Sequence, residues 1–280
     1  MTTRQDSTTG RWEVVVDLTA YNGAGLVPQN DGIYASFSEL QQYVHRQFAR
    51  RDYGNPDKWN PELAYKIEVN DDFTEYTIHL RDDIYWQVPQ NVDLSKPELE
   101  WLKEPRKLTA EDCVFYFELV QMPKVEAGAI KSYYSELEGA EVVDENTFKV
   151  TWNEKVRHSL EMTIGYYPMP KWLYTKNRDG TKIAEESIGS KFNNHWSGKM
   201  GIVLGVGPYA ITEVSEDKQI VMEKYDRYWG PEPRLDRIEF KIIKKATQGY
   251  TRVQSGDLDF SVMPPADYKK DVLDAGPKSP

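Results

Sequence analysis

The sequence lacks three features, and each absence narrows what the protein can be. Its 280 residues contain one cysteine, Cys113, so no disulfide can form within the chain. The cysteine count therefore does not distinguish an oxidising from a reducing compartment. No apolar run approaches the roughly 20 residues that a membrane-spanning helix needs. Lys and Arg number 35 against 45 Asp and Glu, and the net charge of -10 argues against nucleic acid as a partner, because phosphate binding needs a basic surface.

Recognisable catalytic motifs are absent as well. The sequence contains no Gly-x-Ser-x-Gly elbow, no phosphate-binding loop and no His-Glu-x-x-His helix. The histidines, which have no spacing typical of metal ligands, are His45, His79, His158 and His195. We therefore expect no catalytic residue, no metal site and no cofactor, and we expect Cys113 to be a buried structural thiol. A carbohydrate-processing enzyme with paired carboxylates is an alternative interpretation, because such carboxylates need not lie close together in the sequence.

The chain does contain enough apolar material for a folded protein. Its 8 Trp, 18 Tyr and 9 Phe are spread along a length that suffices for one large domain or two small ones. The N-terminus, from Met1 to Gly10, is polar and lacks the apolar core of a signal peptide. Either the protein is cytoplasmic, or its native leader is not part of this chain.

Residue periodicity predicts an alternation of strands and helices. Strands are expected at 12–19, 64–69, 75–80, 140–143, 147–152, 209–214, 219–224, 237–243 and 258–262. Helices are expected at 36–51, from Thr109 onward, in short pieces around 182–190, and at 246–255. Thr109 and Asp112 have the spacing of a capping box, and Gly256 suits a left-handed helix cap. Arg50 and Arg51 would lie in the last turn of the helix over 36–51.

Five local signatures, in this order, resemble a known family. They are Asn60-Pro61-Glu62-Leu63-Ala64 leading into 71–81, then Leu108 to Phe115, then Tyr133-Tyr134 with 141–144, then Pro168-Met169-Pro170-Lys171, and finally Gly207 to Asp259. The last run includes Gly207-Pro208-Tyr209, Tyr228-Trp229-Gly230, Leu235-Asp236-Arg237-Ile238 and Ser255-Gly256-Asp257-Leu258-Asp259. Together they are similar to the extracellular solute-binding proteins that deliver peptides and related solutes to ABC importers. The chain departs from that pattern at 88–106, where a longer acidic insertion replaces a short turn.

The resemblance implies a fold and a division of the chain. The expected fold is mixed α/β (α+β): a periplasmic-binding-protein-like first lobe with an inserted α+β subdomain, and with the second lobe missing. Residues 1–38 and 171–262 would form the lobe-one core, 39–170 the inserted subdomain, and 263–280 the start of the second lobe.

The resemblance also implies a role outside the cytoplasmic membrane. The protein would be no enzyme but the substrate-binding component of an ABC importer, located in the periplasm or elsewhere outside the cytoplasm. Its partners would be a peptide or other small solute and an ABC permease. It would meet the membrane only through that permease or a removed lipid anchor. A stand-alone protein-interaction module is a further alternative.

Candidate ligand contacts lie at strand ends and loops. The expected ligand-binding residues are Tyr21, Asn22, Asp31, Tyr34, Tyr166 and Tyr167. Asp31 could meet the amino terminus of a peptide, whereas each Tyr could equally be packed with its hydroxyl in water. Gly207-Pro208-Tyr209 and the Tyr228-Trp229 pair are expected to be structural, because such bulky aromatic residues are mostly buried.

Overall fold

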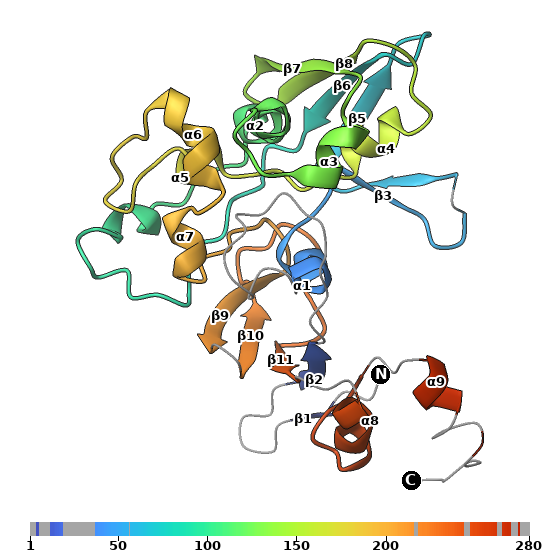
Figure 1. Cartoon of the computed structure of the whole chain (residues 1–280), viewed down its shortest axis with the longest axis vertical. Helices are drawn as coiled ribbons and strands as arrows, with labels where there is room; N and C mark the ends of the chain where they lie inside the picture. Colours follow the sequence, from blue (N-terminus) through green and yellow to red (C-terminus); the bar gives the residue numbers. More distant parts are fainter. Residues whose placement is uncertain are drawn as a thin grey trace.

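Two sheets organise the chain, and helix α1 (Phe37–Val44) lies between them in the view of Figure 1. The structure is a computed structural model that describes residues 4–5, 12–18, 37–55, 57–215, 218–243, 247–261, 265–269 and 274. Within these residues, no helix is long and apolar enough to cross a membrane.

The five-stranded sheet has the strand order β1-β2-β11-β10-β9. Its strands are β1 (Arg4–Gln5), β2 (Trp12–Leu18), β9 (Tyr209–Ser215), β10 (Gln219–Lys224) and β11 (Arg237–Ile242). β2 and β11 run parallel, with Leu18 opposite Ile242, and the other neighbours are antiparallel. The carboxyl ends of β2 and β11 therefore lie together at one edge of the sheet.

Alternation along β11 decides which face of this sheet is buried. Ile238 and Phe240 are buried, whereas Glu239 and Lys241 are only partly covered and form an ion pair. α1 contributes Leu40 and Val44 to the same apolar cluster. Burying an aliphatic side chain contributes roughly 2 kcal/mol, so this cluster fixes α1 to the sheet.

The four-stranded sheet is antiparallel, with the order β5-β6-β8-β7. Its strands are β5 (Ala64–Val69), β6 (Glu75–Leu80), β7 (Leu137–Asp144) and β8 (Thr147–Trp152). The strands predicted at 64–69, 75–80 and 147–152 are confirmed, and the one predicted at 140–143 is longer, from Leu137 to Asp144. Helix α2 (Ala110–Gln121) packs on this sheet and places Phe115 and Phe117 in the same core as Phe148 of β8.

Asp112 joins three segments at the start of α2. One carboxylate oxygen accepts hydrogen bonds from Nε1 of Trp86 at 2.9 Å and from the amide of Thr109 at 3.3 Å. The other accepts from the amide of Lys171 at 2.8 Å. The predicted capping box is confirmed. Burial raises the pKa of Asp112 to about 6. Cys113, the next residue, is buried as expected.

The predicted helix over 36–51 is too long. α1 ends at Val44, and the chain turns into β3 (Ala49–Arg51), which pairs with β4 (Trp59–Pro61). Phe48 continues the apolar spacing of the predicted helix, but its ring packs 5.4 Å from that of Phe148 in the other core. Tertiary packing thus overrides the helical pattern. Arg50 and Arg51 consequently lie on a two-stranded ribbon that projects from the body (Figure 1).

Short helices complete the body around the four-stranded sheet. They are α3 (Gly128–Tyr133), α4 (Ser159–Ile164), α5 (Lys171–Tyr174), α6 (Glu185–Phe192), α7 (Trp196–Lys199) and the 3-10 helix η2 (Glu100–Lys103). Leu173 and Phe192 belong to the core of this body, and so do Leu99 and Leu102 of the acidic insertion. The chain passes from this core to that of the five-stranded sheet near 203–209. The division of the lobe at 170 stays a prediction.

Gln87 and two glycines tie the two bodies together. The Gln87 amide nitrogen donates to the carbonyl oxygens of Gly207 at 3.0 Å and Tyr209 at 2.8 Å, and its oxygen accepts from the amide of Gly205 at 3.3 Å. A Cβ atom on Gly205 would lie 1.9 Å from the carbonyl oxygen of Val44. Only glycine allows this close approach to α1.

The described part ends with two short helices, α8 (Thr247–Gln254) and α9 (Pro265–Tyr268). The predicted helix at 246–255 is confirmed, and Gly256 follows it with a φ of 80°, as a left-handed cap requires. The strand expected at 258–262 is not formed by 258–261, and Val262 lies outside the described residues.

Candidate ligand-binding site

Two cavities lie at the junction of the two bodies, one on each side of His45 and Tyr167. Their volumes are about 310 Å³ and 510 Å³, which suits small ligands. Both cavities have His45 and Tyr167 in their walls, and the two ring centroids lie 5.3 Å apart. We name the smaller one the apolar cavity and the larger one the basic cavity.

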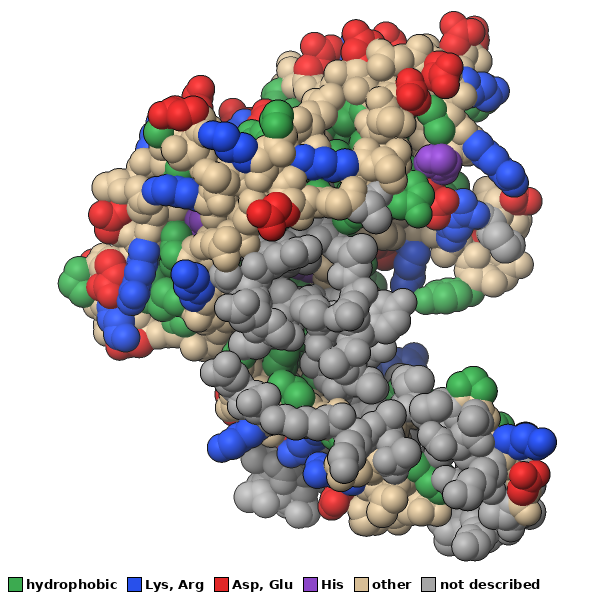
Figure 2. Space-filling view, viewed as in Figure 1, with side chains coloured by type: hydrophobic (Ala, Val, Ile, Leu, Met, Phe, Trp, Pro, Cys, Tyr) green, Lys and Arg blue, Asp and Glu red, His purple; other side chains and the backbone are tan. Residues whose placement is uncertain are grey.

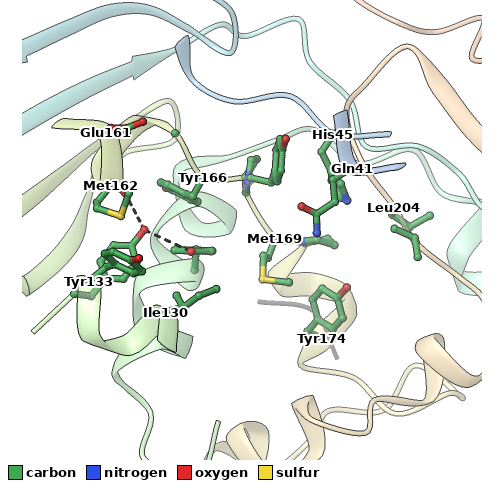
Figure 3. A pocket seen from close by; sticks show the side chains of 17 residues that line it. Gln41, His45, Ile130, Tyr133, Glu161, Met162, Tyr166, Met169, Tyr174 and Leu204 are labelled. Carbon is green, nitrogen blue, oxygen red and sulfur yellow. Dashed lines mark hydrogen bonds between the residues drawn. The ribbon is translucent and has the colours of Figure 1, made fainter. Parts of the chain in front are cut away.

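The apolar cavity is walled by side chains from both bodies. Gln41 and His45 come from α1 and its end, and Ile130 and Met162 come from the α3 and α4 side (Figure 3). Met169, which follows α4, lies between these two groups, and Tyr174 of α5 lies below it in this view (Figure 3). The cavity therefore presents mainly aromatic rings, thioethers and aliphatic groups.

Two buried tyrosine hydroxyls of this wall, those of Tyr134 and Tyr166, are already hydrogen-bonded. Tyr166 donates to the carbonyl oxygen of Cys113 at 2.9 Å, and Tyr134 donates to that of Met162 at 3.0 Å. The ring of Tyr166 stacks on that of Tyr116 at 4.3 Å. Burial raises the pKa of Tyr134 and of Tyr166, which keeps both hydroxyls neutral. A ligand in this cavity meets the ring surfaces of these residues.

The basic cavity has a different lining. Arg46 and Arg50 contribute positive charge, and Glu62 is its acidic residue. Arg50 pairs with Glu62 at 3.6 Å, whereas Arg46 donates from Nε to the hydroxyl of Tyr228 at 3.2 Å. The other walls are aromatic residues and prolines: Tyr43, Tyr53, Tyr209, Pro208, Pro231 and Pro233. Figure 2 shows the molecule hollowed beside the projecting ribbon, with basic side chains along this side.

His45 stands between the cavities as a neutral group. Burial lowers its pKa to about 4, so the imidazole carries no charge at neutral pH. Its Nδ1 atom is buried and has no hydrogen-bond partner among the described residues. Buried polar atoms are almost always bonded, so this atom can receive a partner from a ligand.

Two of the predicted contact residues meet at this junction. Tyr167 lies in the walls of both cavities. Tyr166 lines the apolar cavity, and its hydroxyl is hydrogen-bonded to the carbonyl oxygen of Cys113. The other four, Tyr21, Asn22, Asp31 and Tyr34, lie outside the described residues. Trp229, expected to be structural, donates from Nε1 to the carbonyl of Val206 at 2.9 Å. Tyr209 and Tyr228 were expected to be structural too, yet both line the basic cavity.

His45 and Arg46 were not among the residues predicted from the sequence. The helical spacing placed both in the interior of a continuous helix, where neighbouring residues point in different directions. The end of α1 at Val44 changes this, because both side chains now belong to the turn that links the two bodies. The sequence held no signal for this turn, because Phe48 continues the apolar spacing of the helix and its contact with Phe148 is seen only in the structure.

Comparison with known proteins identifies the family. The model of the bacterial extracellular solute-binding proteins, family 5 (middle), matches residues 58–279. The chain belongs to this family. The resemblance inferred from the five ordered signatures is thereby confirmed.

Relatives of this family-5 chain include proteins named for peptide binding. It is 26% identical over 222 residues to the dipeptide-binding protein DppE of Bacillus subtilis, covering 76% of this chain and 36% of that protein. It is also 26% identical over 218 residues to the dipeptide-binding protein of Escherichia coli, covering 75% of this chain and 37% of that protein. The chain thus spans little more than a third of the length of these relatives.

A solved structure shows the same fold. The oligopeptide-binding protein AppA of Bacillus subtilis, in complex with a nonapeptide, matches with a TM-score of 0.66 at 19% sequence identity. The match covers 92% of this chain and 45% of that one. The family-5 chain therefore has the mixed α/β fold of the periplasmic-binding-protein type, over an extent consistent with one lobe.

Proposed function

We propose that this chain is the solute-binding lobe of an ABC importer component that captures peptides outside the cytoplasmic membrane and delivers them to a permease. Its family consists of extracellular solute-binding proteins, and the relatives named above bind dipeptides or a nonapeptide. A lobe of this kind holds solute on one wall of a cleft, and hinge closure supplies the opposite wall.

The observation that carries the proposal is the pair of cavities on His45 and Tyr167. Together they offer an apolar lining, a charged lining and an unpartnered polar atom within one site. Binding sites for small ligands combine these same elements, with a few polar groups set among apolar ones. The parallel β2 and β11 add a second feature, because open α/β sheets bind ligands beside the carboxyl ends of such strands.

An enzyme with paired carboxylates receives no comparable support. Such a site needs two carboxyl groups facing one bond of the substrate. Among the described residues, Asp112 is the one buried acidic side chain, and hydrogen bonds from Trp86, Thr109 and Lys171 occupy both its oxygens. Glu161 and Glu62 line the cavities, but they lie in different ones.

Calorimetry with short peptides tests the proposal. We expect the 280-residue chain to bind di- and tripeptides, with an affinity at least about tenfold weaker than that of a form extended by a second lobe, because one wall cannot exclude water. Free amino acids and a disaccharide serve as control ligands. Equal affinity in both forms would contradict capture between lobes, and binding of the disaccharide alone would contradict peptide recognition.

A further inference from the structure

Arg46 is a cation that has no acidic partner among the described residues. Its Nε donates to the hydroxyl of Tyr228, and its Nη1 donates to the carbonyl oxygens of Gln42 and, at 3.1 Å, His45. None of the ion pairs within the described residues includes Arg46, and Nη2 makes no hydrogen bond there. The guanidinium is therefore oriented by neutral groups while part of its donor capacity stays unused.

This arrangement stands out in an acidic protein. The chain has a net charge of -10, and the neighbouring Arg50 does pair with an acid, Glu62, at 3.6 Å. A partly buried cation is normally matched by an anion, because removing it from water is costly. A planar guanidinium with fixed orientation fits a carboxylate through two parallel hydrogen bonds.

The apolar cavity begins next to this cation. His45 and Arg46 are consecutive residues, and Tyr167 lines both cavities. Burial raises the pKa of Tyr167, and the positive charge of Arg46 opposes this rise. In a peptide, the terminal carboxylate and the last side chain branch from one Cα atom, so they can enter two cavities that share a wall.

We propose that this junction recognises the carboxyl end of a peptide whose last residue is apolar or aromatic. The terminal carboxylate binds Arg46 in the basic cavity, and the last side chain enters the apolar cavity. His45 offers one neutral hydrogen-bonding atom at the shared wall. This assignment rests on the proposed function, and it adds the class of peptide and the residue that selects it.

Matched peptides and variants test the assignment. The probes are Ala-Phe, its C-terminal amide and Ala-Gly, measured by isothermal titration calorimetry on the full chain. We expect the wild type to bind Ala-Phe at least about tenfold more tightly than either of the other two, a difference typical of one good charged contact or one buried side chain. Arg46→Gln should remove the preference for the acid over the amide and leave the affinity for the amide unchanged.

Two further variants serve as controls. Arg157→Gln removes an exposed arginine away from both cavities and should behave as the wild type. Arg46→Lys keeps the charge but lacks the planar guanidinium group, so it should retain only part of the preference for the acid over the amide. If circular dichroism shows that Arg46→Gln does not fold, Arg46→Lys takes its place. An undiminished preference for the acid in folded Arg46→Gln, or in Arg46→Lys where that variant replaces it, would overturn the assignment, and so would equal binding of acid and amide by the wild type. If the wild type bound no peptide, the proposed function itself would fail.

Discussion

The two bodies of the molecule hold their polar side chains in different ways. Around the four-stranded sheet, Gln87, Asp112 and His195 are buried, and each makes hydrogen bonds to main-chain groups. On the five-stranded sheet, Lys224 and Arg237 lie at the accessible face and form ion pairs with nearby acids. The four-stranded sheet carries surface ion pairs as well, so what distinguishes the first body, among the described residues, is its set of buried polar side chains.

The junction differs from both. Among the described residues, His45 has a buried nitrogen without a partner, and Arg46 has no acidic partner. Polar groups that folding leaves unsatisfied lower stability and are kept where they serve a ligand. Arg106 Nε and Trp172 Nε1, inside the first body, are also buried without a partner among the described residues. The site is therefore placed by a combination of features, since at the junction such an atom lies in the wall that two cavities share.

The largest effect is expected from Asp112→Ala. Three donors, on Trp86, Thr109 and Lys171, lose their acceptor, and α2 loses half of its capping box. We expect a loss of about 3 kcal/mol in the free energy of unfolding, since each buried group without a partner costs roughly 1–3 kcal/mol and the burial of the carboxylate is relieved. Urea denaturation at pH 7 measures the change.

Glu111→Ala is the matched control for Asp112→Ala. Glu111 precedes Asp112 in the first turn of α2 but is exposed. Its removal costs its interaction with the helix dipole, roughly 0.3–1 kcal/mol, and relieves its repulsion of the Asp112 carboxylate. Equal losses in both variants would show that the buried hydrogen bonds of Asp112 add nothing, and would remove the distinction between the two bodies.

Local patterns predicted most of the sheets and of α2. The hairpins β5–β6 and β9–β10, the capping box at Thr109 and Asp112, and the cap at Gly256 all depend on residues close in sequence. The end of α1 could not be predicted in this way. It depends on Phe48 leaving one core for another, which is a contact between residues 100 apart in the chain.

The candidate site was predictable only in part. Tyr167 was expected at a ligand-facing position, and the structure places it in the walls of both cavities. His45 and Arg46 gain their surroundings from Tyr167 and Tyr228, which lie more than 100 residues further along the chain. No local spacing encodes such a pairing, so sequence periodicity alone assigned them to an ordinary helix.

A smaller effect, dependent on pH, is expected from His195. Its Nε2–H donates to the carbonyl of Lys176 at 3.1 Å, and its Nδ1 accepts from the hydroxyl of Ser197 at 2.8 Å. Burial lowers its pKa from 6.5 to about 4, so between these values the unfolded chain binds more protons than the folded one. The stability that the neutral imidazole contributes is complete above pH 6.5 and is lost as the pH falls toward 4.

The comparison of wild type with His195→Gln isolates this term. From pH 7 to pH 5, we expect the wild type to lose about 2 kcal/mol more unfolding free energy than the variant, the value given by the two pKa values of His195. Urea denaturation at both pH values measures it. A proton NMR titration of the imidazole should show a midpoint near 4, and a midpoint near 6.5 would remove the explanation.

The smallest effect is expected from Lys224→Gln in the five-stranded sheet. Lys224 lies 2.9 Å from carboxylates of both Glu232 and Asp236, and these contacts raise its pKa. Because the ammonium group is at the surface, water and salt weaken both pairs. We expect a slight fall in the melting temperature at about 0.05 M NaCl and none at about 0.5 M. The loss caused by Asp112→Ala should persist at both salt concentrations, because buried hydrogen bonds are not screened. If salt instead abolished the effect of Asp112→Ala, or left that of Lys224→Gln intact, the two bodies would not differ in the way described.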